Sequence, residues 1–138
     1  MRRGLALQDL GDLLEQPLVA VLCTYRRDGG TLLSPVWHRW RDGGFDVATN
    51  HDDIKVRHLA RDPRASILVY EHDRPYRGIE LRTQPTLVTE GALDAGREIA
   101  IRYLGREEGE KFAAESQDDI VVRLEPGEVR AWDFSDES

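Results

Sequence analysis

Apolar positions along the chain follow a helical period in three places. The first is the start of the sequence, where Leu7, Leu10, Leu13 and Leu14 recur at helical spacing until Pro17 ends the pattern. A short amphipathic helix is therefore expected from about residue 5. The same period predicts two further helices, at residues 50–61 and 93–112, the second interrupted by Gly105 and Gly109.

Runs rich in β-branched and aromatic residues predict strands between these helices. The predicted strands cover residues 18–25, 31–40, 45–49, 65–70, 76–90 and 119–132. Asp28-Gly29-Gly30 is a turn signal, so the first two strands are predicted to form a hairpin. Pro35 cannot donate a ladder hydrogen bond, which places its strand at a sheet edge or a bulge, and Pro85 is expected to break the long strand 76–90.

The order of these elements indicates the fold class. Mostly antiparallel strands, with helices at the start, middle and late positions, favour a small β-barrel decorated by helices. The chain has 138 residues without a repeat or a linker, so residues 1–138 are predicted to form one domain.

Composition and charge narrow the classes of function. A chain with 40% hydrophobic and 33% charged residues is typical of a soluble globular protein. Its net charge of −7 argues against nucleic acid or an anionic membrane as a partner. No long apolar stretch follows Met1, which argues against a secretory signal, and we expect a cytoplasmic protein. The single Cys23 cannot form an internal disulfide, and the scattered histidines suggest no metal site.

The segment 50–68 reverses the sign of the overall charge. Its cations, which outnumber its three aspartates, are Lys55, Arg57, Arg61 and Arg64. Lysine and arginine next to a helix N-terminus can bind a phosphate group. The alternative is a solvated helix face on which Asp52 and Asp53 pair with these cations.

Several strings in the sequence resemble one known family. They are residues 18–25, the string Ser34-Pro35-Val36-Trp37, the string Lys55-Val56-Arg57-His58-Leu59-Ala60-Arg61-Asp62-Pro63-Arg64 and residues 76–82. Over residues 5–134 the chain resembles the pyridoxamine 5′-phosphate oxidase-like split barrels that bind FMN or F420. It is most similar to the actinobacterial branch that uses the deazaflavin F420. The resemblance implies a mainly β fold with α-helices, a six-stranded antiparallel, Greek-key-like split barrel with flanking helices.

The resemblance also implies a homodimer with two cofactor sites at the subunit interface. The residues that it assigns to the ring are Ser34, Pro35, Val36 and Trp37, with Thr49 and Asn50 alongside. It assigns the phosphate to Lys55 and Arg57, with His58 at a position that the family often fills with Asn. The resemblance also implies that Tyr76 and Arg77 approach the cofactor from the next hairpin, and that Trp132 closes the site from the partner chain. Asp53 departs from the pattern, because many relatives carry a basic residue there.

The function implied is that of an F420-dependent oxidoreductase, which transfers a hydride between the reduced deazaflavin and a small conjugated organic substrate. An FMN-dependent oxidoreductase of the same fold is the close alternative. A non-catalytic flavin- or tetrapyrrole-binding protein and a purely structural dimer are further alternatives. For Trp37 and Trp40 the alternative to a role in the site is a structural one, in which they pack in the barrel or the dimer interface. The sequence shows no catalytic constellation, so the catalytic residues stay unknown.

Overall fold

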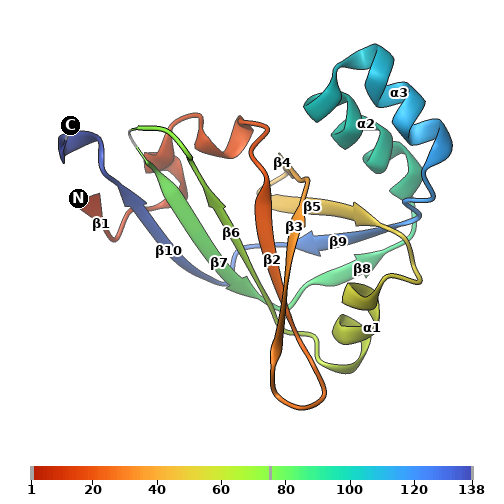
Figure 1. Ribbon diagram of the computed structural model, residues 1–138. Helices are drawn as coiled ribbons and strands as arrows, with labels where there is room; N and C mark the ends of the chain where they lie inside the picture. Colours follow the sequence, from red (N-terminus) through yellow and green to blue (C-terminus); the bar gives the residue numbers. More distant parts are fainter. Residues whose placement is uncertain (1, 75, 138) are drawn as a thin grey trace.

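Two antiparallel sheets form the molecule in the computed structural model, which describes residues 2–74 and 76–137. Within these residues the large sheet has the order β1-β10-β7-β6-β2-β3 and the small sheet the order β4-β5-β9-β8 (Figure 1). The large sheet contains β1 (Arg2–Arg3), β2 (Ala20–Tyr25), β3 (Thr31–Val36), β6 (Ala65–Tyr70), β7 (Gly78–Thr83) and β10 (Glu128–Asp133). The small sheet contains β4 (Arg39–Arg41), β5 (Gly44–Thr49), β8 (Thr86–Val88) and β9 (Ile120–Leu124).

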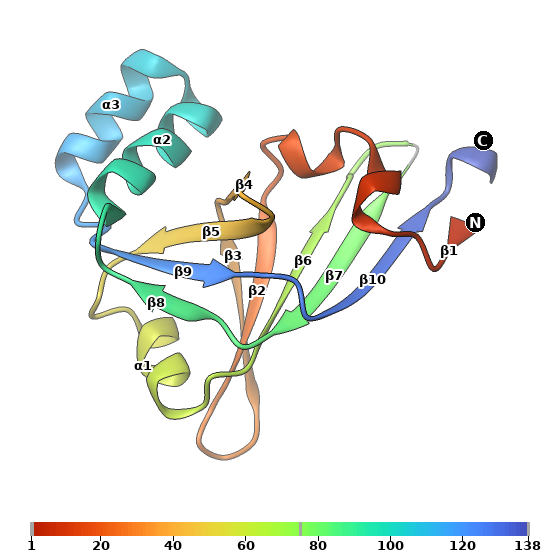
Figure 2. The same ribbon diagram turned by 180° about the vertical axis from the view of Figure 1, so that it is seen from behind.

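Helices flank the sheets at three places. They are α1 (Ile54–Arg61), α2 (Ala92–Leu104) and α3 (Arg106–Glu115), with 3-10 turns η1 (Leu7–Leu10), η2 (Leu13–Glu15) and η3 (Ser135–Glu137). Figures 1 and 2 show the two termini together at the β1–β10 edge, and the α2–α3 hairpin at the opposite end of the molecule. None of the helices in the described part of the chain is long and apolar enough to cross a lipid bilayer.

The main core lies between the two sheets. The large sheet contributes apolar side chains that include Leu22, Ile67 and Leu81, and the small sheet contributes Phe45 and Val122. All of these side chains are fully buried. Burying one side chain of this size contributes about 1.5–3 kcal/mol, so this apolar layer is the main source of stability.

The predicted mainly β fold with antiparallel sheets and flanking helices is confirmed, but a closed six-stranded barrel is not, because neither sheet closes within the described residues. Three of the predicted strands each divide between the sheets. The run 31–40 becomes β3 and the start of β4, separated at Trp37 and His38. The run 76–90 becomes β7 and β8, separated near Pro85, and the run 119–132 becomes β9 and β10, separated near Gly127. A Cβ at Gly127 would come within 2.5 Å of the Arg82 carbonyl oxygen, so the close approach at this crossing requires glycine.

Glycines also change two of the predicted helices. The first predicted helix is two 3-10 turns, because Gly11 between them has a φ of 60° and ends η1, although Leu10, Leu13 and Leu14 are buried as their spacing suggests. The predicted helix 93–112 is the α2–α3 hairpin, broken at Gly105. Helix α1 begins later than predicted, with Asp53 as its N-cap residue.

The end of α2 is tied to two distant stretches of backbone. The Arg102 guanidinium donates to the carbonyl oxygens of Leu14, Gln16 and His38. The Tyr103 hydroxyl accepts from the His38 amide at 3.1 Å and donates to the Leu18 carbonyl at 2.6 Å. These bonds fix the start of β2 and the β3–β4 connection against α2.

His38, in that connection, is fully buried, and neither of its ring nitrogens has a hydrogen-bond partner among residues 2–74 and 76–137. Burial lowers the pKa of His38 to about 4, and the nearby positive charge of Arg102 contributes. The folded protein therefore holds this imidazole neutral at a pH where the unfolded chain would protonate it.

We expect this difference to make the protein less stable in mild acid. Between about pH 6.5 and 4 the unfolded chain binds one more proton at His38, so the free energy of unfolding falls as the pH falls. The contribution of His38 to this loss is about 3 kcal/mol. Urea unfolding at several pH values should show that His38→Leu removes this share of the pH dependence, whereas His72→Gln, at an exposed position, keeps it. An identical slope for wild type and His38→Leu would contradict the assignment.

Candidate functional site

A single face of β3 leads from the β2–β3 hairpin toward the small sheet. Leu32, Ser34 and Val36 share this face, because they pair with the buried Thr24, Leu22 and Ala20 of β2. β3 is an edge strand, as Pro35 indicated, so one side of it is open to the neighbouring helix α1.

At the far end of this face lies a cavity of about 300 Å³, which we call the Trp37 cavity. Five of the predicted site residues line it together, namely Pro35, Val36, Trp37, Thr49 and Lys55. The α2–α3 hairpin closes the other side with Gly96, Ile99 and Phe112, and Asp118 enters from the segment before β9. The structure thus brings residues from β3, β5 and α1 to one place.

Aromatic stacking fixes the wall of the Trp37 cavity. The Trp37 and Tyr103 rings are nearly parallel, with centroids 5.0 Å apart, and the Phe112 ring tilts against Trp37 at 5.2 Å. Since the Tyr103 hydroxyl is bound at Leu18 and His38, the position of Trp37 follows from the anchoring of α2.

Lys55 does not present a free charge to this cavity. Its ammonium lies 2.9 Å from Asp53 Oδ2, and its side chain is only 14% exposed. The same Asp53 accepts a hydrogen bond from the Thr49 hydroxyl through Oδ2 and from the Lys55 amide through Oδ1. Burial raises the pKa of Asp53, but the hydrogen bonds from Lys55 and Thr49 outweigh this effect and the pKa is lowered.

A second carboxyl group faces the Trp37 cavity. Burial raises the pKa of Asp118, and the negative charges of Asp119 and Asp53 add to the shift. The ionisable groups nearest the cavity are therefore one lysine and two aspartates, and Lys55, paired with Asp53, gives it no net positive charge. This arrangement disfavours a phosphate at Lys55.

Arg57 and His58 belong to a second cavity, of about 640 Å³, at the other end of the β3 face. We call it the arginine groove. Its basic residues are Arg26 and Arg27 on the β2–β3 loop and Arg57 and Arg61 on α1. His58 is buried, and its Nδ1 lies 2.9 Å from the Thr24 hydroxyl oxygen, which orients the ring. Ser34 lies on β3 between Leu32 of the groove and Val36 of the Trp37 cavity.

Two predicted site residues lie elsewhere, on the outer face of the large sheet. Tyr76 and Trp132 line a cavity of about 500 Å³ together with Tyr70. Trp132 covers Gly78 on the neighbouring strand, where a Cβ would come within 2.2 Å of the indole. A single chain does not bring these aromatic residues to the Trp37 cavity.

The remaining predicted residues have structural partners. Arg77 binds Glu71 and Asp12, each at 2.7 Å, and donates to the Leu10 carbonyl. Hydrogen bonds from Arg77 lower the pKa of Glu71 to about 2, against the opposing effect of burial. Asn50 donates to the Gln117 carbonyl, so it ties the loop before α1 to the segment before β9.

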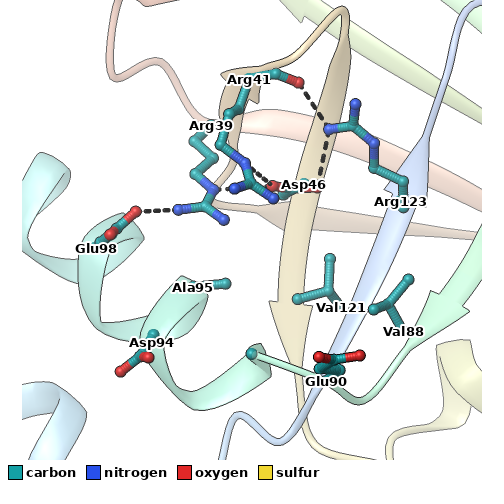
Figure 3. Close-up of a pocket in the computed structure, with 11 residues that line it drawn as sticks. Arg39, Arg41, Asp46, Val88, Glu90, Asp94, Ala95, Glu98, Val121 and Arg123 are labelled. Atoms are coloured by element: carbon teal, nitrogen blue, oxygen red, sulfur yellow. Dashed lines mark hydrogen bonds and ion pairs between the residues drawn. The ribbon is translucent and has the colours of Figure 1, made fainter.

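A further cavity, of about 360 Å³, lies between α2 and the outer face of the small sheet. Figure 3 shows the carboxylate of Asp46 surrounded by the guanidinium groups of Arg39, Arg41 and Arg123, with Glu98 of α2 bound to Arg39. Asp46 is almost completely buried, and these ion pairs satisfy it. We interpret this cluster as a clamp that joins β4, β5, β9 and α2.

The sequence alone did not identify all the residues that line the Trp37 cavity and the arginine groove. The adjacent Arg26 and Arg27 at a hairpin tip were a visible charge signal for the arginine groove. Nothing in the sequence pattern indicated that Gly96 and Phe112 would reach the Trp37 cavity, because their placement depends on how α2 and α3 dock.

The fold is that of a small antiparallel protein, and the Trp37 cavity and the arginine groove lie beside its edge strand β3. A family model described as pyridoxamine 5′-phosphate oxidase matches residues 7–133, and the chain belongs to this family. The resemblance found in the sequence is thereby confirmed. No curated protein matches the sequence significantly.

Solved structures share the fold. The conserved hypothetical protein Rv2991 from Mycobacterium tuberculosis has 25% identity and a TM-score of 0.80, over 94% of this chain and 86% of that one. A protein named F420 reductase has 22% identity and a TM-score of 0.70, over 86% and 93% of the two chains. HutZ, the heme storage protein from Vibrio cholerae, has 17% identity and a TM-score of 0.68, over 89% and 92%.

The double role of Asp53 leads to a prediction about α1. Asp53→Ala removes both the N-cap and the partner of Lys55, so we expect the free energy of unfolding to fall by about 1 kcal/mol. Asp53→Asn should lower the free energy of unfolding by less, because the oxygen of the Asn side chain can still accept a hydrogen bond from the Lys55 backbone amide. Urea denaturation tests both variants, with Asp52→Ala as the control on the neighbouring exposed carboxylate. Equal losses for the Ala and Asn variants would show that the cap contributes little.

Proposed function

We propose that the protein is an oxidoreductase that binds a flavin-type cofactor, with F420 as the cofactor and FMN as the alternative. The observation that carries the proposal is the Trp37 cavity, where residues of β3, β5 and α1 that the family resemblance assigns to the cofactor meet in space. The fold similarity to the protein named F420 reductase supports it.

The lining of the Trp37 cavity suits a flat conjugated ring. Trp37 and Phe112 give it aromatic walls, and Pro35 and Val36 give it an apolar edge. Gly96 keeps it open, because a Cβ there would come within 3.0 Å of the Asp118 Cβ and 3.6 Å of the Ala48 Cβ. These residues would orient the ring and exclude water from one side of it.

The chemistry supplied by the bound cofactor would be hydride transfer to or from a small conjugated substrate. The chain itself would contribute orientation and proton handling. Asp118 is the carboxyl group of the Trp37 cavity with a raised pKa, so it is the side chain best placed to hold a proton there. We assign no catalytic residue beyond this.

The proposal includes a homodimer. The outer face of the large sheet carries apolar side chains that water does not favour, among them Leu33, which is 64% exposed, and the half-buried Leu68 and Trp132. A second copy on this face would bury these side chains. Leu33 and Pro35 lie on the same strand, and Pro35 lines the Trp37 cavity, so we expect the second copy to bring its own Tyr76 and Trp132 toward that cavity.

A cofactor-binding protein without turnover is the second candidate. The fold similarity to HutZ, the heme storage protein, favours it. Saturable binding of a cofactor without reduction of any offered acceptor would identify this function.

Cofactor titration tests the proposal directly. We expect FMN or F420 to bind the purified protein with a change in the cofactor's own fluorescence. Trp37→Leu should weaken binding by about tenfold or more, because it removes an aromatic wall worth about 1.5 kcal/mol. Trp40→Phe is the control, since Trp40 packs on Phe45 in the core. If neither cofactor binds, or if Trp37→Leu binds as tightly as the wild type, the proposal is wrong.

Sedimentation measurements test the dimer. Leu33→Asp places a charge on the outer face of the large sheet and should convert a dimer into a monomer, with weaker cofactor binding as a consequence. Leu93→Asp is the matched control, because Leu93 is similarly exposed, at 67%, but lies on α2. A wild-type protein that sediments as a monomer would exclude the homodimer.

A further inference from the structure

The arginine groove concentrates positive charge on an acidic protein. Its four guanidinium groups belong to Arg26, Arg27, Arg57 and Arg61. The carboxylate that lines it is Asp28, which accepts a hydrogen bond from the Gly30 amide at 2.8 Å. The groove therefore has a local charge of about +3 from full ionisation of these groups, although the whole chain has a net charge of −7.

This charge is not compensated within the protein. Across residues 2–74 and 76–137, no carboxylate forms an ion pair with Arg26, Arg27 or Arg57, and Arg61 donates to the Tyr25 carbonyl at 2.6 Å. Arg57 and Arg61 are four residues apart on one face of α1, a spacing at which like charges repel. An anion in the groove would relieve this repulsion.

Lys55 is a weaker anion-binding site than the arginine groove. Its ammonium is already bound to Asp53, and Asp118 adds a second carboxyl group to the same cavity. The Asp53 oxygen that binds the Lys55 ammonium also accepts a hydrogen bond from the Thr49 hydroxyl. An anion that displaced this oxygen from Lys55 would therefore disturb the Thr49 hydrogen bond as well. Binding there would have to overcome repulsion that the arginine groove does not impose.

We propose that the arginine groove, rather than Lys55, is the site for a multivalent anion, with the hairpin arginines Arg26 and Arg27 as ligands beside Arg57. The ligand class is a phosphate ester or an oligocarboxylate on an organic chain, because Leu32 and Ile54 give the groove apolar walls. That this anion is part of the cofactor rests on the proposed function. The β3 face, through Ser34, connects the groove to the Trp37 cavity.

Calorimetric titration with pyrophosphate and with citrate tests the groove by itself. We expect both probes to bind the wild-type protein and the double variant Arg27→Gln/Arg57→Gln to bind them about tenfold more weakly or worse. Lys55→Gln should change either affinity by less than about threefold. Arg106→Gln, an exposed arginine on α3, is the matched control. Absence of binding, or a larger loss in Lys55→Gln than in the double variant, would overturn the proposal.

A comparison of FMN with riboflavin connects the groove to the cofactor. The phosphate should make FMN bind about tenfold more tightly than riboflavin in the wild type, and the double variant should lose this preference. If the preference survives in the double variant and disappears in Lys55→Gln, the proposed function stands and the groove proposal fails. If pyrophosphate binds the groove and neither FMN nor F420 binds, the groove proposal stands and the proposed function fails.

Discussion

The hydrogen bonds of Arg102 and Tyr103 set the geometry on which the candidate site depends. Buried backbone groups without partners cost about 1–3 kcal/mol each, and these two side chains satisfy groups at Leu14, Gln16, Leu18 and His38. The same Tyr103 ring stacks on Trp37. The wall of the Trp37 cavity is therefore positioned by bonds to backbone more than sixty residues away in the sequence, and α2 has to dock before the cavity exists.

Three clusters of charge in this structure differ in how fully their charges are compensated. Asp46 is surrounded by arginines, and Lys55 is held by Asp53, so both clusters are internally satisfied. The arginine groove is not. A satisfied cluster must break its own ion pairs before it can bind a ligand, whereas guanidinium groups without a carboxylate partner have no ion pair to break. This difference, rather than the number of charged residues, is the reason for proposing the arginine groove as a binding surface and the Asp46 cluster as a clamp.

Sequence patterns predicted those features that depend on local chemistry. The β2–β3 hairpin, the edge position of Pro35 and the strand at residues 65–70 are confirmed, because turn residues and strand composition determine them locally. Periodicity could not show where a strand passes from one sheet to the other, since β7 and β8 continue the same alternation on either side of Pro85. It also could not place Phe112 or Asp118 at the cavity, because that depends on tertiary docking.

The family resemblance located Lys55 in the chain, and the alternative drawn from charge alone, a pairing of these cations with Asp52 and Asp53, named its partner. Asp53 both caps α1 and binds Lys55, and it can do so because a carboxylate has two oxygens, one for the Lys55 amide and one for the ammonium. A basic residue at position 53 could neither cap the helix in this way nor compensate the lysine. The same helix carries Arg57 one turn further along, facing the hairpin arginines. Asp53 therefore holds Lys55 in an ion pair, and the arginine groove keeps the cations of this region that have no carboxylate partner within residues 2–74 and 76–137.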